Sequence, residues 1–103
     1  MTYMVNFRTY QLSTQLYQAA KTMKLSHPLQ DQLIRAASSI SLNLMEGSAK
    51  PTAKDRAKFY RISLGSLREV QALIDLEREE LEALSQLADQ VGGHLYRLCK
   101  NTK

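Results

Sequence analysis

Glycine and proline, the residues that most often end or bend a helix, are rare enough in this sequence to leave long stretches uninterrupted. The 103 residues include four glycines and two prolines, and no segment alternates apolar and polar residues as a half-buried strand would. Helices therefore account for the chain best. The sequence predicts an all-α fold built from four helices.

The first two helices are separated by a short loop that leads into proline. We expect a first helix from about Asn6 to Met23 and a second that starts at Pro28 and ends near Gly47. Proline suits the first turn of a helix, because the N–H that it lacks would have no partner there. The short loop favours side-by-side packing of the two helices.

The third helix is expected to open at Thr52, a good N-cap with Asp55 three residues on, and to reach about Glu77. Apolar residues then recur at nearly heptad spacing to the end of the chain. They are Leu67, Val70, Ile74, Leu81, Leu84, Ala88, Val91, Leu95 and Leu98. We place the turn into the fourth helix around residues 78–81, where charges occur on every side. One continuous helix across this point is the alternative.

Four helices joined by short loops predict an antiparallel up-down four-helix bundle, and residues 1–103 are enough for one such domain. No apolar run approaches the roughly 20 residues that span a bilayer, and the N-terminus lacks the order of a signal peptide. We therefore expect a cytoplasmic protein that makes no contact with membranes.

Apolar residues on the first two helices cover more than the single stripe that a bundle helix needs. Surface of this kind usually marks an interface, so we predict self-association. The expected interface residues are Tyr10, Tyr17, Ile34, Leu42 and Met45. The alternative is a second helix that is simply central, with tyrosine hydroxyls that tolerate water.

Residues 35–50, RAASSISLNLMEGSAK, carry serine, alanine and asparagine where leucine would be expected. Small side chains let two helix backbones approach closely, and the third helix offers serines and Gly65 opposite the region of Gly47. Its core stripe is expected to be Phe59, Ile62, Ser63, Ser66, Leu67, Val70, Leu73 and Ile74. The second and third helices are therefore expected to cross closely.

A polar seam should follow this crossing, and we interpret it as structural. Its expected members are Arg35, Asn43, Glu46, Ser66 and Glu69. A buried amide needs partners, and Ser63 and Ser66 are the candidates for Asn43. Arg35, or a neighbouring subunit, is expected to pair Glu46 and Glu69.

Positive charge is concentrated in the first two thirds of the chain. Up to residue 68 there are ten basic and three acidic side chains, a balance of +7, whereas the remainder has a balance of −3. A basic ridge is expected on and just before the third helix, formed by Lys50, Lys54, Lys58, Arg61 and Arg68. Such a ridge can follow a phosphate backbone of RNA or DNA. A solvated lysine-rich face is the alternative, since neither an RNA-binding motif nor a base-stacking aromatic residue accompanies the ridge.

Catalysis is not predicted. A nucleophile needs a base and a group that orients it, but His27 and His94 stand alone in the sequence, and helical spacing explains the serines as packing residues. The single cysteine, Cys99, excludes an internal disulfide, and neither a cysteine pair nor a histidine cluster is present for a metal. We expect a non-enzymatic protein without cofactor or metal.

Two segments resemble the paired signature of a four-helix-bundle family encoded by intervening sequences in bacterial 23S rRNA genes. They are RAASSISLNLMEG at 35–47 and FYRISLGSLREV at 59–70. The matching positions are Arg35, Ala36, Ala37, Ser39, Ile40, Asn43, Leu44, Glu46, Gly47, Phe59, Ile62, Ser63, Gly65, Ser66 and Glu69. The sequence departs from the pattern at Ile34, where the family has the first of two arginines, and by a shorter segment between Ser66 and Val91.

The resemblance implies an assembly of identical subunits, a five-membered ring, with no assigned enzymatic activity. More distantly, the chain is similar to accessory proteins of diversity-generating retroelements, which bind nucleic acid and a reverse transcriptase through a basic pentameric barrel. Two functional hypotheses follow. The protein is either a homo-oligomer that binds nucleic acid by its phosphates, or a scaffold that presents its mixed faces to another protein.

Overall fold

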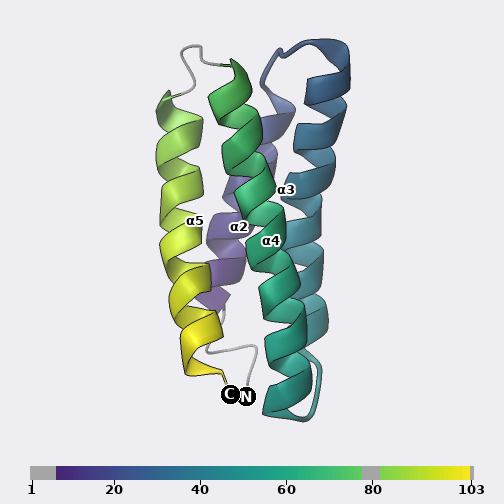
Figure 1. Cartoon of the computed structure of the whole chain (residues 1–103), viewed down its shortest axis with the longest axis vertical. Helices are drawn as coiled ribbons and strands as arrows, with labels where there is room; N and C mark the ends of the chain where they lie inside the picture. Colours follow the sequence, from purple (N-terminus) through teal and green to yellow (C-terminus); the bar gives the residue numbers. More distant parts are fainter. Residues whose placement is uncertain (1–6, 78–81, 103) are drawn as a thin grey trace.

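A computed structural model describes residues 7–77 and 82–102 of the chain. Their helices are α2 (Phe7–Lys21), α3 (His27–Ser48), α4 (Ala53–Glu77) and α5 (Glu82–Asn101), and these described residues contain no strand. The prediction of an all-α protein with four helices is confirmed (Figure 1). The expected turn at 78–81 lies outside the described residues. Because α4 and α5 pack side by side, the alternative of one continuous helix is wrong.

The starts of α3 and α4 follow from the predicted capping signals. Pro28 occupies the first turn of α3. At α4, the backbone N–H of Asp55 donates to Oγ1 of Thr52 at 3.1 Å, so Thr52 caps the helix as predicted. Each helix boundary that glycine, proline or a capping residue indicated lies within about two residues of its expected place, which is the usual uncertainty of a helix end.

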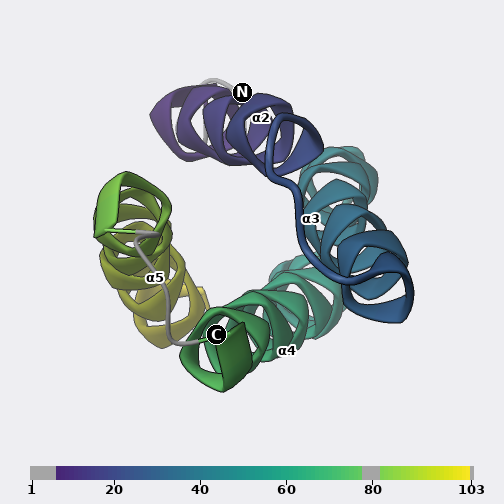
Figure 2. The same ribbon diagram turned by 90° about the horizontal axis from the view of Figure 1, so that it is seen from above.

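Each helix packs against two others, and no diagonal pair makes contact among the described residues. Figure 2 shows the four helices arranged around the bundle axis in chain order, so that α2 also meets α5. Contacts between α3 and α4 join Ser48 to Tyr60 and Ser39 to Ser66, so residue numbers fall along one helix as they rise along the other. Successive helices run in opposite directions in Figure 1.

The buried stripe of α4 differs from the expected one. Tyr60 is 1% exposed and belongs to the same core cluster as Leu67 and Val70, whereas Ile62 is 43% exposed and Phe59 is half-buried. The placement of Ile62 in the core is wrong, and that of Phe59 is right only in part. Because α4 packs against both α3 and α5, its buried face is turned toward the side that lies between the two neighbours.

None of the helices described in the structure has the length and apolar character required to cross a membrane.

Candidate nucleic-acid interface

Hydroxyl groups join α3 to α4 along a polar seam. The hydroxyls of Ser39 and Ser66 lie 2.8 Å apart, and Ser63 donates to the backbone carbonyl of Ile40 at 2.9 Å. Nδ2 of Asn43 donates to the carbonyl (2.9 Å) and to the hydroxyl (3.1 Å) of Ser39. The prediction that Asn43 bonds Ser63 or Ser66 is wrong, because Ser39 is one turn away on its own helix. Ser39 then connects Asn43 to Ser66.

Gly47 lies where α3 and α4 approach each other closely. A Cβ atom at this position would lie 2.9 Å from Cβ of Phe59 and 2.9 Å from Cε1 of Tyr60, closer than such atoms normally come. Beside it, the hydroxyls of Ser48 and Tyr60 lie 3.2 Å apart. A Cβ at Gly65 would meet nothing within 4 Å, so the expectation that Gly65 takes part in the close crossing is wrong. Its position faces solvent instead.

The charged residues assigned to the seam lie outside it. The side chain of Arg35 is 79% exposed and pairs with Asp31 at 3.0 Å. Glu46 pairs with Lys50 at 3.0 Å, and Glu69 is exposed. The prediction that Arg35 pairs Glu46 and Glu69 is wrong within the subunit. Arg35 and Glu46 each form an ion pair with a residue four positions away in the sequence instead.

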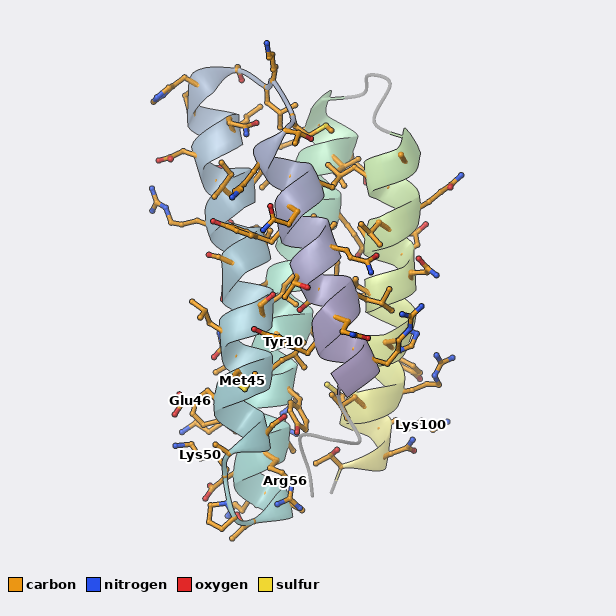
Figure 3. The ribbon with its side chains drawn as sticks, turned by 180° about the vertical axis from the view of Figure 1, so that it is seen from behind. Tyr10, Met45, Glu46, Lys50, Arg56 and Lys100 are labelled. Carbon is orange, nitrogen blue, oxygen red and sulfur yellow. The ribbon has the colours of Figure 1, made fainter. Side chains whose placement is uncertain are left out.

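The predicted interface residues lie along α2 and α3. Leu42 and Met45 are 68% and 48% exposed, and Ile34 is half-buried. Tyr10 and Tyr17 are also half-buried and pack against the edge of the core. Figure 3 shows Tyr10 and Met45 on the same side of the molecule, on neighbouring helices. The structure therefore brings Tyr10 and Met45 to one side, and the two tyrosines also contribute to the subunit's own packing.

The basic ridge consists of four exposed side chains of α4 and a fifth that differs from them. Lys54, Lys58, Arg61 and Arg68 are exposed at helical spacings that place them on one face, and none forms an ion pair with any described residue. Lys50 is half-buried, paired with Glu46, and placed 5.2 Å from the centre of the Phe59 ring. Its charge is therefore already partly neutralised.

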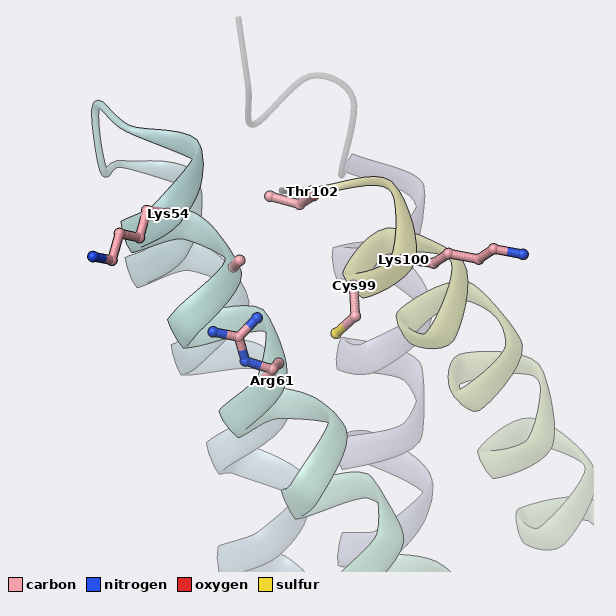
Figure 4. Close-up of a pocket in the computed structure, with 6 residues that line it drawn as sticks. Lys54, Arg61, Cys99, Lys100 and Thr102 are labelled. Carbon is pink, nitrogen blue, oxygen red and sulfur yellow. The ribbon is translucent and has the colours of Figure 1, made fainter.

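An open groove of about 540 Å³ lies beside the ridge, between α4 and the end of α5. Its lining residues are Lys54, Ala57, Arg61, Cys99, Lys100 and Thr102. In Figure 4, Cys99 points toward the gap between the helices and Arg61 extends over α4 on the side of Lys54, whereas the ammonium ends of Lys54 and Lys100 point away on opposite sides. Burial raises the pKa of the Cys99 thiol, and the nearby Arg61 charge partly opposes this shift.

Lys100 places a further cation on α5 at the far side of the groove, and the sequence did not predict it. It is 39 positions away from Arg61 in the chain and lines the same groove only because the two helices pack in opposite directions. The predicted antiparallel bundle could have indicated this position of Lys100, because such a bundle places the end of the fourth helix beside the start of the third.

The other end of the same pair of helices is acidic. A second hollow of about 330 Å³ is lined by Gln71, Ile74, Asp75, Ser85 and Asp89. Nε2 of Gln71 donates to the Asp89 carboxylate at 3.2 Å, and Arg68 donates to Oε1 of Gln71 at 3.1 Å. The surface of α4 and α5 thus changes from cationic to anionic along the bundle, and an anionic ligand is favoured at the cationic end.

The described residues include no group of three His, Cys, Asp or Glu side chains placed to hold a metal. Nδ1 of His94 lies 3.5 Å from the hydroxyl of Thr9 on α2. Burial lowers the pKa of His94, and the charges of Arg97 and Arg8 lower it further.

Comparison with known proteins identifies the family. No curated protein and no solved structure matches the chain. The model of the family described as 23S rRNA-intervening sequence protein matches residues 3–101, which include both segments that carry the resemblance noted above. With nearly its whole length matched and four helices in its structure, the chain belongs to the 23S rRNA-intervening sequence protein family.

Proposed function

We propose that this protein is a non-enzymatic nucleic-acid-binding protein that holds RNA or DNA by its phosphates along the exposed face of α4. The observation that carries the proposal is the row formed by Lys54, Lys58, Arg61 and Arg68, whose charges form no ion pair with the described residues. Lys100 adds a cation across the groove.

Exposed cations that form no ion pair with the described residues are suited to phosphates, because no carboxylate of those residues has to be displaced; Arg68 would exchange only its exposed hydrogen bond to Gln71. A cation that neutralises a phosphate also releases condensed counterions, which favours binding and makes it depend on salt. Lys50 should contribute less than the other four residues of the ridge, since Glu46 already holds its ammonium group at 3.0 Å.

Self-association is the second part of the proposal. The exposed side chains of Leu42 and Met45 support a contact between copies through α3, at the edge of which Tyr10, Tyr17 and Ile34 lie half-buried. A homo-oligomer would repeat the basic face once per subunit and strengthen phosphate binding through multiple contacts. Five subunits are expected on the family resemblance, and the cytoplasm is the compartment that we propose.

The test of nucleic-acid binding is a charge reversal with a matched control. Lys54→Glu, Lys58→Glu and Arg61→Glu together should weaken binding of a labelled RNA hairpin and flatten its salt dependence, because fewer counterions are released. The control combines Arg8→Glu, Lys21→Glu and Lys24→Glu, three cations also exposed but on α2 and the loop that follows it. It changes the net charge equally and should bind more tightly than the first variant.

Titration at low and at physiological salt separates the two functional hypotheses. Absence of binding at low salt, or equal binding by the wild type and the α4 variant, would favour the scaffold hypothesis, in which another protein is the partner. Equal losses in the two triple variants would show that net charge matters and the position of the ridge does not.

Light scattering tests self-association. A mass near 11.7 kDa that does not change with concentration would identify a monomer and contradict the proposal. Leu42→Glu with Met45→Glu should dissociate the oligomer and preserve helical content, because both side chains are exposed in the subunit. Leu76→Glu is the control, since Leu76 is 69% exposed on α4, away from the proposed contact.

A further inference from the structure

An exposed aromatic ring lies beside the basic ridge. Tyr96 of α5 is 56% exposed, and the large exposed side chains of the described residues include no other aromatic ring. Neither the packing of the core nor the basic ridge on α4 accounts for a tyrosine at this position.

The neighbours of Tyr96 along α5 locate it at the boundary with α4. A Cβ atom on Gly92 would lie 3.3 Å from Cδ2 of Leu67, so position 92 faces α4. Cys99 lines the groove together with Arg61, so position 99 faces α4 as well. Tyr96 is four residues after the first and three before the second, which places it on the same side of the helix. Its exposure puts it at the outer edge of that side.

The same two contacts show which part of α4 lies across from Tyr96. Position 92 lies opposite Leu67 and position 99 opposite Arg61, so Tyr96 lies at a level between them. On the exposed face of α4, Arg61 and Arg68 are separated by two helical turns, about 10 Å along the axis. The tyrosine ring is therefore placed beside this pair of cations.

Gly65 interrupts the row of cations between Arg61 and Arg68. The ridge positions 54, 58, 61, 65 and 68 follow helical spacing, and position 65 is the one without a side chain. A Cβ there would meet nothing within 4 Å. The exposed surface of α4 consequently has an open space next to the level of Tyr96, with an arginine on each side.

From this arrangement we propose that the surface formed by Tyr96, Gly65, Arg61 and Arg68 is a base-stacking site for single-stranded nucleic acid. The ring of Tyr96 stacks against one base, which occupies the space over Gly65, and the two arginines hold the phosphates on either side. This inference rests on the proposed function and adds to it the class of nucleic acid that is bound.

An accessible aromatic ring discriminates between single and double strands. The faces of bases inside a duplex are covered by their neighbours, whereas the unpaired bases of loops, bulges and ends can be splayed out and stacked on tyrosine. Stacking combined with a row of cations is the usual way in which proteins bind single strands with little sequence preference. Phosphate contacts alone would not make the protein prefer single strands over duplexes in this way.

The experiment compares two labelled oligonucleotides of about 12 nucleotides, a length within the range that single-strand binding folds cover. One carries normal bases, and the other has the same phosphates with abasic sugars. Wild-type protein should bind the first about tenfold more tightly than the second, because stacking on one aromatic ring contributes about this much. Tyr96→Leu should reduce the ratio to about one, and Tyr96→Phe should keep it. Gly65→Leu, which fills the open space, should also reduce it.

The outcomes separate this inference from the function on which it rests. If wild-type protein binds the abasic strand as tightly as the normal one, or prefers a duplex of the same sequence, the stacking site is wrong and phosphate binding stands. If Tyr96→Leu leaves the ratio of the two affinities unchanged, the stacking site is likewise wrong and phosphate binding stands. If neither strand is bound at low salt, both proposals are wrong. Circular dichroism of the variants should be unchanged, because Tyr96 and Gly65 are exposed.

Discussion

Helix α4 packs against α3 and α5, and the residues that it presents to these two helices differ in size and charge. Toward α3 it presents small and hydroxyl-bearing residues, with Ser63 fully buried and Tyr60 so placed that a Cβ atom on Gly47 of α3 would collide with it. Toward α5 it leaves two hollows, one lined by cations and one by carboxylates. One side of the helix thus fixes the fold, and the other leaves charged surface open to a ligand.

The polar groups on the two sides also differ in what they contribute to stability. Buried hydrogen bonds such as that from Ser63 to the Ile40 carbonyl cannot be replaced by water when they are lost. The contacts of Gln71 with Arg68 and Asp89 are exposed, and water can substitute for each partner. Substitutions on the α3 side should therefore affect folding, and those on the α5 side should affect binding.

Two glycines provide the largest expected difference. Gly47→Leu should destabilise the fold by about 3 kcal/mol or more, because added atoms would overlap Phe59 and the buried Tyr60. Gly65→Leu should stabilise it by about 0.5–1 kcal/mol, since leucine is the better helix former and the space is open. Thermal melting of the two variants measures the contrast. Equal melting temperatures would mean that α3 and α4 do not approach closely at Gly47.

Bulk at the serine contact should have the next largest effect. Ser66→Leu replaces a hydroxyl that lies 2.8 Å from that of Ser39, and overpacking should cost about 1–3 kcal/mol. Chemical denaturation measures the loss. A variant as stable as the wild type would indicate that the seam near Ser66 is loose enough to accept leucine, and the contrast between the two sides of α4 would be weaker.

Removal of single polar groups should separate the two sides by a smaller amount. Ser63→Ala should cost about 1 kcal/mol, the usual value for a buried hydrogen bond. Gln71→Ala breaks two exposed contacts and should change stability by less than about 0.5 kcal/mol. Urea denaturation of both variants gives the comparison. A larger loss in Gln71→Ala would reverse the assignment of which side holds the fold.

The smallest effect is expected at the contact between α2 and α5, which extends the comparison to a third pair of helices. The lowered pKa of His94 means that the unfolded chain binds its proton more readily than the folded one. The free energy of unfolding should therefore decrease as the pH falls below about 6.5 and level off once the folded histidine is protonated. His94→Gln should remove the part of this decrease that sets in as the pH falls through about 6.5. An equal decline in the variant would assign it to other groups.

Local sequence signals determined the helices and the family. Pro28 and Thr52 act on the backbone of their own helical turn. The starts of α3 and α4 could therefore be predicted without knowing which helices pack against them. The periodicity of the apolar residues likewise identified most of the core. The segments 35–47 and 59–70 carried the resemblance to the family that the comparison confirmed.

Only the tertiary structure decided which side of a helix is buried and which distant residues meet. Tyr60, rather than Ile62, fills the core because α4 is held between two neighbours, and its rotation depends on both. Gly47 and Gly65 look equivalent in a sequence, yet one lies against Tyr60 and the other against solvent. Helical periodicity is a property of a single helix, whereas burial and the grouping of charges are properties of helix pairs. For that reason the sequence predicted a basic ridge on one helix, and only the structure showed that Lys100 of another helix lines the groove beside it.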